Sequence, residues 1–375
     1  MARPKKVQEK AELHVHTKES FDGSLTSTKI HMDALRYNIK YVAFTDHDTT
    51  AASREWILNH GGDLSMPIHE IDGVKYINGV ELSVCFQGIT DSNGKQFNFH
   101  LKVLGASQAP DSPLEQFLTI KEDNDAFVNY TVLQYLAAQI GVTLDEEYIK
   151  DYILERRRDD PKFSRFDGAA AIDFLDTYNL MQGRSERELT RILKNLPRPK
   201  RVYIDAKDAI DIAHASGGIV TMAHPAKSLA KLSEADRKMV IEKLLDMGID
   251  GFERIYNAAT PEINELIDEC QKNHYSVNEY LNDGGSDNHH VCPGNPLGQT
   301  YLEDITCDKV ETVIKDVEKR QFELENNMNW HRSYPIKTKA QIDHTILFYS
   351  SLNSRFKMEF TSRTTPGGIG SGTRN

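Results

Sequence analysis

The run YVAFTDHD, residues 41–48, places a short apolar stretch directly before two aspartates that flank a histidine. Apolar runs of this length are typical of buried strands, and parallel strands carry functional side chains in the loops that follow them. Two further runs end in the same way: YINGV (76–80) precedes Glu81, and GGIVTMA (217–223) precedes His224. The pattern predicts strands whose ends meet at one chemical site.

Segments with helical periodicity alternate with these strands. KMVIEKLLDMGIDGFERI, residues 238–255, indicates a helix, a glycine stop and a strand. Ser112 before Pro113 and Glu115 offers an N-cap, a proline at the first helical position and a capping box. Short strands alternating with helices predict an α/β fold with a parallel sheet, either open or closed into a barrel.

Residues 113–200 interrupt this alternation. The stretch is rich in helical patterns, as in FVNYTVLQYLAAQIGV, and has few strand candidates. We expect a helical insertion over one mouth of the barrel, between a first barrel part at 11–112 and a second at 201–329. Residues 330–375 form a polar C-terminal extension, and its end, TTPGGIGSGTRN, has linker-like composition, so we expect partial disorder there.

Composition limits the classes of function. The chain has 375 residues and a net charge of −11, which disfavours a protein that coats nucleic acid over its whole surface. Basic runs at 155–165 and 184–201 leave two interpretations open, a local phosphate contact or a solvated helix face. No segment resembles a membrane span, and MARPKKVQEK lacks the apolar region of a secretory signal, so we expect a soluble, cytoplasmic protein.

The cysteines narrow the chemistry of any metal site. Cys85, Cys270, Cys292 and Cys307 are scattered, and no CxxC pair occurs. This argues against a disulfide framework and against a thiolate zinc site. A metal ion in this protein would therefore be held by histidine, aspartate and glutamate.

The segment AELHVHTKESFDG, residues 11–23, carries two histidines that an extended chain points to the same side. A lone HxH is more often a solvated strand face than a ligand pair, and a single histidine is more often a satisfied core residue. Here, however, histidines and acids recur along the expected strands and at their ends. The candidates are His14, His16, His47, Glu81, His100, His224, Asp287 and His289.

This set of side chains selects among metals. Imidazole and carboxylate without thiolate suit zinc, manganese or iron in a multinuclear cluster, in which Glu81 can bridge two ions. Such a cluster makes hydroxide available near neutral pH and clamps both the attacking and the leaving oxygen of a phosphoryl centre. The residues therefore predict metal-assisted hydrolysis.

The order of motifs resembles the polymerase and histidinol phosphatase (PHP) superfamily. HVHT with a downstream FDG is followed by FTDHD, GVELS, FHLKVLG, MAHP and GGSDNHH, over about residues 11–300. The resemblance implies a distorted (β/α)7 barrel with a helical insertion and a centre of two or three metal ions. It implies a first ion on His14, His16, Glu81 and Asp287, a second on Glu81, His100 and His224, and a third on Asp22, His47 and His289.

The insertion resembles that of stand-alone PHP phosphoesterases, which act on nucleoside 3′,5′-bisphosphates and on 5′ ends of short RNA or DNA. Those proteins often carry Arg-Pro-His there. The nearest match is Arg165-Phe166-Asp167, so we expect Arg165 to contact a phosphate. Many of them also have a histidine at the register of Lys102. We expect His100 to be the ligand on that strand, and Lys102 and Arg254 to contact phosphate.

The predicted function is that of a metal-dependent phosphoesterase, in which a metal-bound hydroxide attacks phosphorus and Glu81, Asp287 and His289 are catalytic. The cofactors would be two or three divalent Mn, Zn or Fe ions. The substrate would be a phosphorylated small molecule or nucleotide, or a short RNA or DNA end. The alternatives are a histidinol-phosphate-type phosphatase, a PHP module that binds a polymerase partner, and a metal-dependent hydrolase of C–N bonds.

Overall fold

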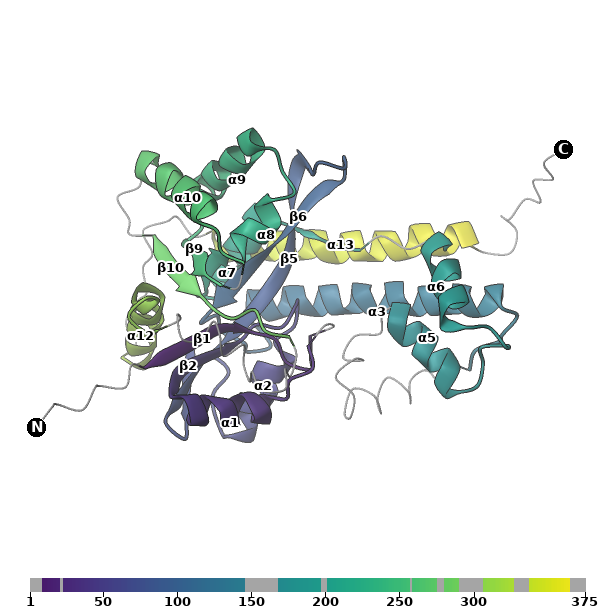
Figure 1. Cartoon of the computed structure of the whole chain (residues 1–375), viewed down its shortest axis with the longest axis horizontal. Helices are drawn as coiled ribbons and strands as arrows, with labels where there is room; N and C mark the ends of the chain where they lie inside the picture. The colour runs from purple at the N-terminus through teal and green to yellow at the C-terminus, as the bar shows by residue number, and fades with distance from the viewer. Residues whose placement is uncertain are drawn as a thin grey trace, which may run out of the picture.

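The computed structural model describes residues 9–20, 23–145, 168–196, 201–256, 258–274, 280–289, 306–326 and 337–364. Two sheets with surrounding helices form a body, and long helices extend from it as an arm (Figure 1). The strands are β1 (Lys10–Val15), β2 (Ile39–Phe44), β3 (Ile68–Ile71), β4 (Val74–Ile77), β5 (Gly79–Thr90), β6 (Gln96–Leu104), β7 (Ile204–Asp205), β8 (Ile219–Met222), β9 (Gly251–Ile255) and β10 (Leu281–Gly284). The helices are α1 (Ser27–Tyr37), α2 (Ala51–Asn59), α3 (Pro113–Gln139), α5 (Gly168–Thr177), α6 (Glu186–Asn195), α7 (Ala206–Ala215), α8 (Pro225–Leu229), α9 (Glu234–Asp246), α10 (Pro261–Asn273), α12 (Glu311–Glu325) and α13 (Lys339–Thr364).

The N-terminal strands form a four-stranded sheet in the order β1-β2-β4-β3. β2 pairs in parallel with β1 and β4, while β3 forms an antiparallel hairpin with β4. Ile30 and Ala34 of α1 and Ala52 of α2 pack with Val42 and Phe44 of β2 in one apolar cluster. Burial of these side chains holds the two helices against the sheet.

The second sheet has six strands in the order β10-β9-β8-β6-β5-β7. The prediction of a parallel sheet is wrong in one respect, because β6 runs antiparallel to both of its neighbours, β5 and β8. β5 ends at Thr90 and β6 begins at Gln96, and a connection this short returns the chain antiparallel. β8, β9 and β10 are parallel to one another, as predicted.

Strand pairing within the described residues gives two open sheets, so the expected closed barrel is not found. The sequence identified strands but not their partners, and it is the pairing that decides closure. Two isolated parallel bridges join the sheets, one between His47 and Glu81 and one between Val15 and Asn288. Both bridges involve or flank predicted metal ligands, so these residues lie where the two sheets meet.

The predicted start of α3 is confirmed in part, because Ser112 caps the helix and Pro113 follows it, but the Glu115 carboxylate accepts from Thr50 and Arg54 instead of closing a capping box. The Ser112 side chain caps α3 by accepting from the Glu115 backbone N–H. The run 76–80, in contrast, is not one strand, since β4 ends at Ile77 and β5 begins at Gly79. A side chain on Gly79 would meet the Phe44 carbonyl oxygen at 2.6 Å, so glycine is required there. Glu81 therefore lies near the start of a strand rather than after its end.

The arm has an apolar cluster of its own. Leu133 and Leu136 of α3, Phe174 of α5 and Leu189 of α6 are buried in it. These helices lie within residues 113–200, where the sequence predicted mainly helix.

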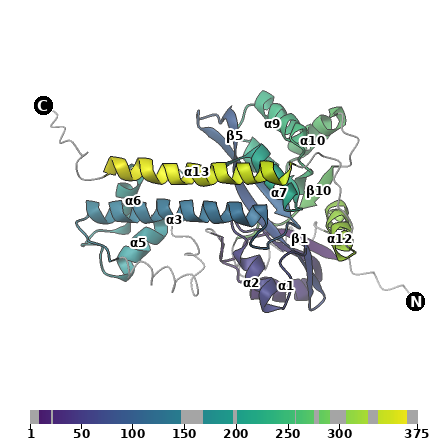
Figure 2. The ribbon, with the colours of Figure 1, turned by 180° about the vertical axis from the view of Figure 1, so that it is seen from behind.

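The C-terminal extension contains a long helix, α13, that the sequence did not predict. It runs alongside α3 in both views (Figures 1 and 2). Ile342, Ile346 and Tyr349 are buried in the main apolar cluster. The end expected to be disordered, 365–375, lies outside the described residues.

Among the described helices, none combines the length and the apolar character needed to cross a bilayer.

Candidate metal centre

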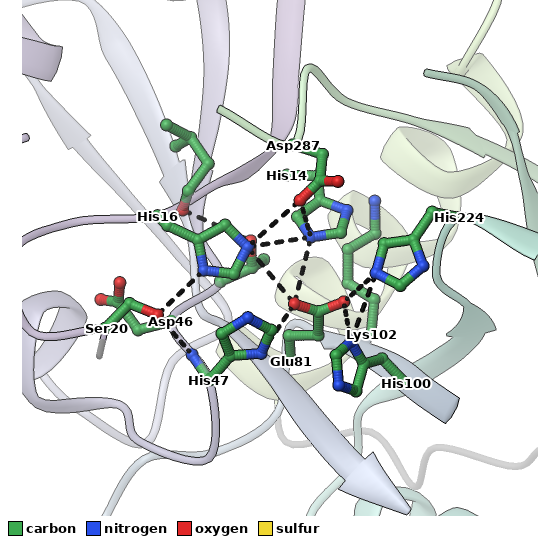
Figure 3. A network of polar contacts seen from close by, with 12 residues as sticks. His14, His16, Ser20, Asp46, His47, Glu81, His100, Lys102, His224 and Asp287 are labelled. Carbon is green, nitrogen blue, oxygen red and sulfur yellow. Dashed lines mark hydrogen bonds and ion pairs between the residues drawn. The ribbon is translucent and has the colours of Figure 1, made fainter. Parts of the chain in front are cut away.

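The side chains that the sequence predicted as metal ligands converge between the two sheets (Figure 3). They come from β1 and the loop after it, the loops after β2, β8 and β10, and strands β5 and β6. Eight of the nine predicted ligands lie together: His14, His16, His47, Glu81, His100, His224, Asp287 and His289. The ninth, Asp22, lies outside the described residues.

The first predicted ligand set is compact. Nε2 of His14 and Nε2 of His16 lie 3.2 Å apart. Each lies close to the same Glu81 oxygen, at 3.5 and 3.3 Å, and to the same Asp287 oxygen, at 3.6 and 3.5 Å. Ligand atoms about 2.1 Å from a tetrahedral ion lie about 3.4 Å from one another. The distances among His14, His16 and Glu81 therefore have the size expected for three ligands of one ion, and Asp287 adds an oxygen near both histidines.

The second set uses the other oxygen of Glu81. Oε1 lies 2.8 Å from Nε2 of His224 and 3.1 Å from Nδ1 of His100, and these two nitrogens are 3.3 Å apart. Because Oε2 faces the first set and Oε1 the second, the Glu81 carboxylate stands between two groups of imidazoles. Glu81 could therefore offer one oxygen to each of two ions.

A third group lies on the far side of His16. His16, His47 and His289 each offer a ring nitrogen within 4.8 Å of the others, and the His16 and His289 rings stack with centroids 4.1 Å apart. His47 Nδ1 is also 3.0 Å from Oε2 of Glu81. The resemblance had placed Asp22 with His47 and His289, and the structure adds His16 to their neighbourhood.

The carboxylate and imidazole groups of this cluster are suited to binding cations. Oε2 of Glu81 is buried and makes no hydrogen bond within the part of the chain that the structure describes, although imidazole nitrogens surround it. Burial alone would raise the pKa of Glu81, but the nearby imidazoles, His100 and His47 foremost, hold its pKa well below the usual value. A buried carboxylate that stays ionised among converging ring nitrogens is suited to divalent metal ions.

Close packing of the loops brings the ligands together. A side chain on Gly285 would meet Cβ of His14 at 2.2 Å, so a glycine is needed where the loop after β10 crosses β1. Asp287 and His224 adopt left-handed backbone conformations, with φ of 53° and 31°. Such conformations are unfavourable for residues with side chains and are found where the surrounding structure enforces them, often at functional sites.

Glu253 of β9 is a functional candidate that the sequence reasoning missed. Its fully buried carboxylate accepts from Nδ1 of His14 at 3.0 Å, from the backbone N–H of His224 at 2.8 Å and from Nζ of Lys102 at 2.9 Å. By binding Nδ1–H, it leaves Nε2 of His14 as the nitrogen that faces the cluster. The only signal in the sequence was a glutamate within the short strand GFERI, residues 251–255.

The expectation that Lys102 contacts phosphate is wrong. Its side chain is fully buried, and Nζ lies 2.9 Å from both Glu253 and Asp283. Burial would lower the pKa of Lys102, but the charges of Asp283 and Glu253 outweigh burial and raise it. Lys102 lies on the same strand face as His100 but deeper in the sheet, where it neutralises buried carboxylates instead of meeting a substrate.

Arg254, another predicted phosphate contact, is instead paired with α10. Arg254 follows Glu253 in β9, so its side chain takes the opposite face of the strand. Its guanidinium donates to Asp268 at 2.5 Å and to the Asn264 carbonyl at 3.1 Å, both in α10. Arg165 lies outside the described residues.

Two solved structures share the fold of this chain. A predicted metal-dependent phosphoesterase from Bifidobacterium adolescentis matches with a TM-score of 0.54 and 17% identity, over 83% of this chain and 96% of its own. An amidohydrolase from Chromobacterium violaceum, solved with bound sulfate and no metal, matches with a TM-score of 0.50 and 20% identity, over 77% of this chain and 90% of its own. The chain thus has a mixed α/β fold shared with these two proteins.

A comparison with proteins of known function identifies one relative of this chain. The 5′-3′ exoribonuclease Rnm of Escherichia coli (strain K12) is 25% identical over 298 residues, which cover 77% of this chain and 88% of that protein. No family model matches the chain. The chain is a distant homologue of this exoribonuclease, and the homology supports the resemblance carried by its motifs.

Proposed function

We propose that this protein is a metal-dependent phosphoesterase that acts on nucleotides or on the 5′ ends of short nucleic acids. The main evidence for this proposal is the position of Glu81. Its two carboxylate oxygens face separate groups of imidazoles at 2.8–3.5 Å. A carboxylate in this position bridges two metal ions in hydrolytic centres. The homology to an exoribonuclease supports phosphate diesters or monoesters as the substrate class.

The proposed cofactors are two or three divalent ions of Mn, Zn or Fe. The first would be held by His14, His16, Glu81 and Asp287, the second by Glu81, His100 and His224, and the third by Asp22, His47 and His289. When bound, such ions supply Lewis acidity and a nucleophilic water at neutral pH. The chain itself supplies the orientation of the ligands.

Three of these residues are proposed to be catalytic: Glu81, Asp287 and His289. The Glu81 carboxylate spans the two inner ligand groups, and Asp287 faces His14 and His16 with one oxygen. His289 Nδ1 contacts the Asp287 backbone carbonyl at 2.9 Å, which leaves Nε2 as its outward nitrogen. The His289 side chain is 22% exposed, so a substrate can reach it.

One observation weighs against hydrolysis of C–N bonds, the activity class suggested by the name of the C. violaceum neighbour. Such hydrolases often use a carboxylated lysine or an aspartate of the barrel as the base. The buried lysine beside this cluster, Lys102, is instead paired as a cation with Glu253 and Asp283. A simple binding module for a polymerase is also disfavoured, because the eight described candidate ligands are all present.

The domain arrangement of the PHP resemblance remains part of this proposal. In it, residues 11–112 and 201–329 form a distorted (β/α)7 barrel, residues 113–200 are a helical insertion, and 330–375 form an extension. Two isolated bridges between the sheets, at Glu81 and at Val15, support this arrangement.

Phosphate release from a nucleoside 3′,5′-bisphosphate tests the proposal. Protein loaded with Mn²⁺ should release phosphate, chelation should abolish the release, and added Mn²⁺ should restore it. A 5′-phosphorylated RNA oligonucleotide assayed in parallel would show whether mononucleotides leave from the 5′ end. If the loaded protein hydrolyses no nucleotide, oligonucleotide or sugar phosphate, the proposed function is wrong.

A matched pair of variants separates the centre from the fold. Asp287→Ala should abolish phosphate release while the far-ultraviolet circular dichroism stays unchanged. His274→Ala is the control, since His274 pairs with Asp246 at 3.1 Å, contacts the Tyr280 hydroxyl and belongs to none of the candidate ligand groups. It should keep wild-type activity.

A further inference from the structure

A lysine lies at the rim of the metal-ligand cluster. Lys227 is in α8, three residues after His224, and its Nζ donates to Oδ2 of Asp287. The other oxygen of Asp287, Oδ1, faces His14 and His16 at 3.6 and 3.5 Å. The Asp287 carboxylate thus stands between the cluster and this ammonium group.

Exposure shows on which side the cluster opens to solvent. The side chains of His14, His16 and Glu81 are 0% exposed. Those of His100 and Lys227 are 30% and 40% exposed. Lys227 and His100 therefore lie at an exposed part of the rim of the cluster, where a substrate can reach them.

The ammonium of Lys227 keeps donors available on this side. It has three N–H donors, and Asp287 is its only acceptor among the described residues. Two other lysines lie next to the centre, but their side chains are buried between acidic residues. Lys121 is 3% exposed between Asp48 and Asp125, and Lys102 is fully buried.

We propose that Lys227 forms an anion subsite at the opening of the cluster, where it binds a non-bridging oxygen of the substrate phosphate. This inference rests on the proposed function, because phosphate esters bring the negative charge that the ammonium would meet. A hydrogen bond between two charged groups is stronger than a neutral one, and it forms in both the bound substrate and the transition state. Lys227 therefore acts mainly on substrate affinity.

The test replaces Lys227 with Met, which keeps the length of the side chain and removes the charge. In the Mn²⁺-loaded protein, Lys227→Met should raise the dissociation constant of inorganic phosphate, measured by calorimetry, about tenfold or more. KM for the nucleoside bisphosphate should rise by a similar factor, with kcat within about threefold of wild type. Lys227→Arg should restore most of the phosphate affinity.

Lys207 provides a matched control. It is 42% exposed and pairs with a buried aspartate, Asp211, in α7, just as Lys227 pairs with Asp287, but no predicted ligand is involved. Lys207→Met should leave phosphate affinity, Mn²⁺ affinity and KM unchanged.

Two results would overturn the subsite. One is unchanged phosphate affinity and KM in Lys227→Met. The other is a tenfold loss of Mn²⁺ affinity in the same variant, which would show that Lys227 serves the ligand Asp287 rather than the substrate. These results can be told apart from failure of the proposed function. If the wild-type protein binds phosphate through Lys227 but hydrolyses no ester, only the phosphoesterase proposal is wrong. If it binds no phosphate, the subsite proposal is wrong.

Discussion

Which nitrogen a histidine presents decides whether it can hold a metal ion. The Glu253 carboxylate accepts from Nδ1 of His14 and from the backbone of His224, so one buried side chain positions two candidate ligands. Partners of this kind fix the tautomer and ring orientation of metal-binding histidines.

Glu253→Ala should lower Mn²⁺ affinity about 10- to 100-fold, because His14 loses the acceptor that orients it. Glu253→Gln keeps an oxygen for Nδ1–H and should lie between wild type and the alanine variant. Titration calorimetry with Mn²⁺ measures both. Glu318→Ala, which removes a half-buried partner of Lys75, is the control. Wild-type affinity in Glu253→Ala would show that His14 needs no such partner.

Lys102→Met should destabilise the fold by about 3–5 kcal/mol, because it leaves the carboxylates of Glu253 and Asp283 buried without a cation. Lys75→Met removes a lysine from a partly exposed pair with Glu318 and should cost less than about 1 kcal/mol. Urea unfolding of both variants makes the comparison. Equal losses would contradict the buried role assigned to Lys102.

At this scale the sequence predicted which side chains converge at the centre better than it predicted the side chains that support them. His14 and His16 could be placed on one side because strand alternation is fixed by backbone geometry. Glu253 and Lys227 carry no spacing signature, since each is a single charge whose partner lies far away in the sequence. Lys102 was misinterpreted for the same reason: the carboxylates that neutralise it come from β9 and the strand after it.

Among the helices and strands, α13 is an element whose mixed composition concealed its helical periodicity. Its residues are mixed in polarity, yet Ile342, Ile346 and Tyr349 recur at i, i+4 and i+7 and pack into the main core. The periodic signal was present, but the polar residues around it favoured the interpretation as an extension. The start of α3, in contrast, could be predicted because Ser112 and Pro113 form a local cap.

Truncation of one buried side chain tests whether α13 belongs to the fold. Ile342→Ala should cost about 2–5 kcal/mol, because Ile342 is 1% exposed in the core. Leu347→Ala, on the same helix but 66% exposed, should change the free energy of unfolding by less than about 0.5 kcal/mol. Denaturant unfolding compares the two, and a small effect of both would contradict the packing of α13.

For the whole molecule, the centre lies where two sheets meet, and its candidate ligands come from strands and loops of both sheets. The sequence predicted the strands that carry the ligands but not the split into two sheets, because strand partners are set by contacts between distant segments. Bound metal ions should therefore tie the sheets together.

Mn²⁺ should raise the melting temperature of the wild-type chain, and a chelator should reverse the rise. At a free concentration of about 100 times the dissociation constant, one bound ion adds about 2.7 kcal/mol to stability. Differential scanning calorimetry measures the shift. Asp287→Ala should show a smaller shift, and an equal shift in that variant would place the stabilising ion elsewhere.

The number of metal ions bound per chain tests the central claim most directly. Mn²⁺ titration followed by metal analysis should find two or three ions in the wild type and at most one in Glu81→Gln, because the bridging carboxylate is replaced by an amide. A wild-type chain that binds one ion or none, or a Glu81→Gln variant that binds as many as the wild type, would contradict a centre bridged by Glu81.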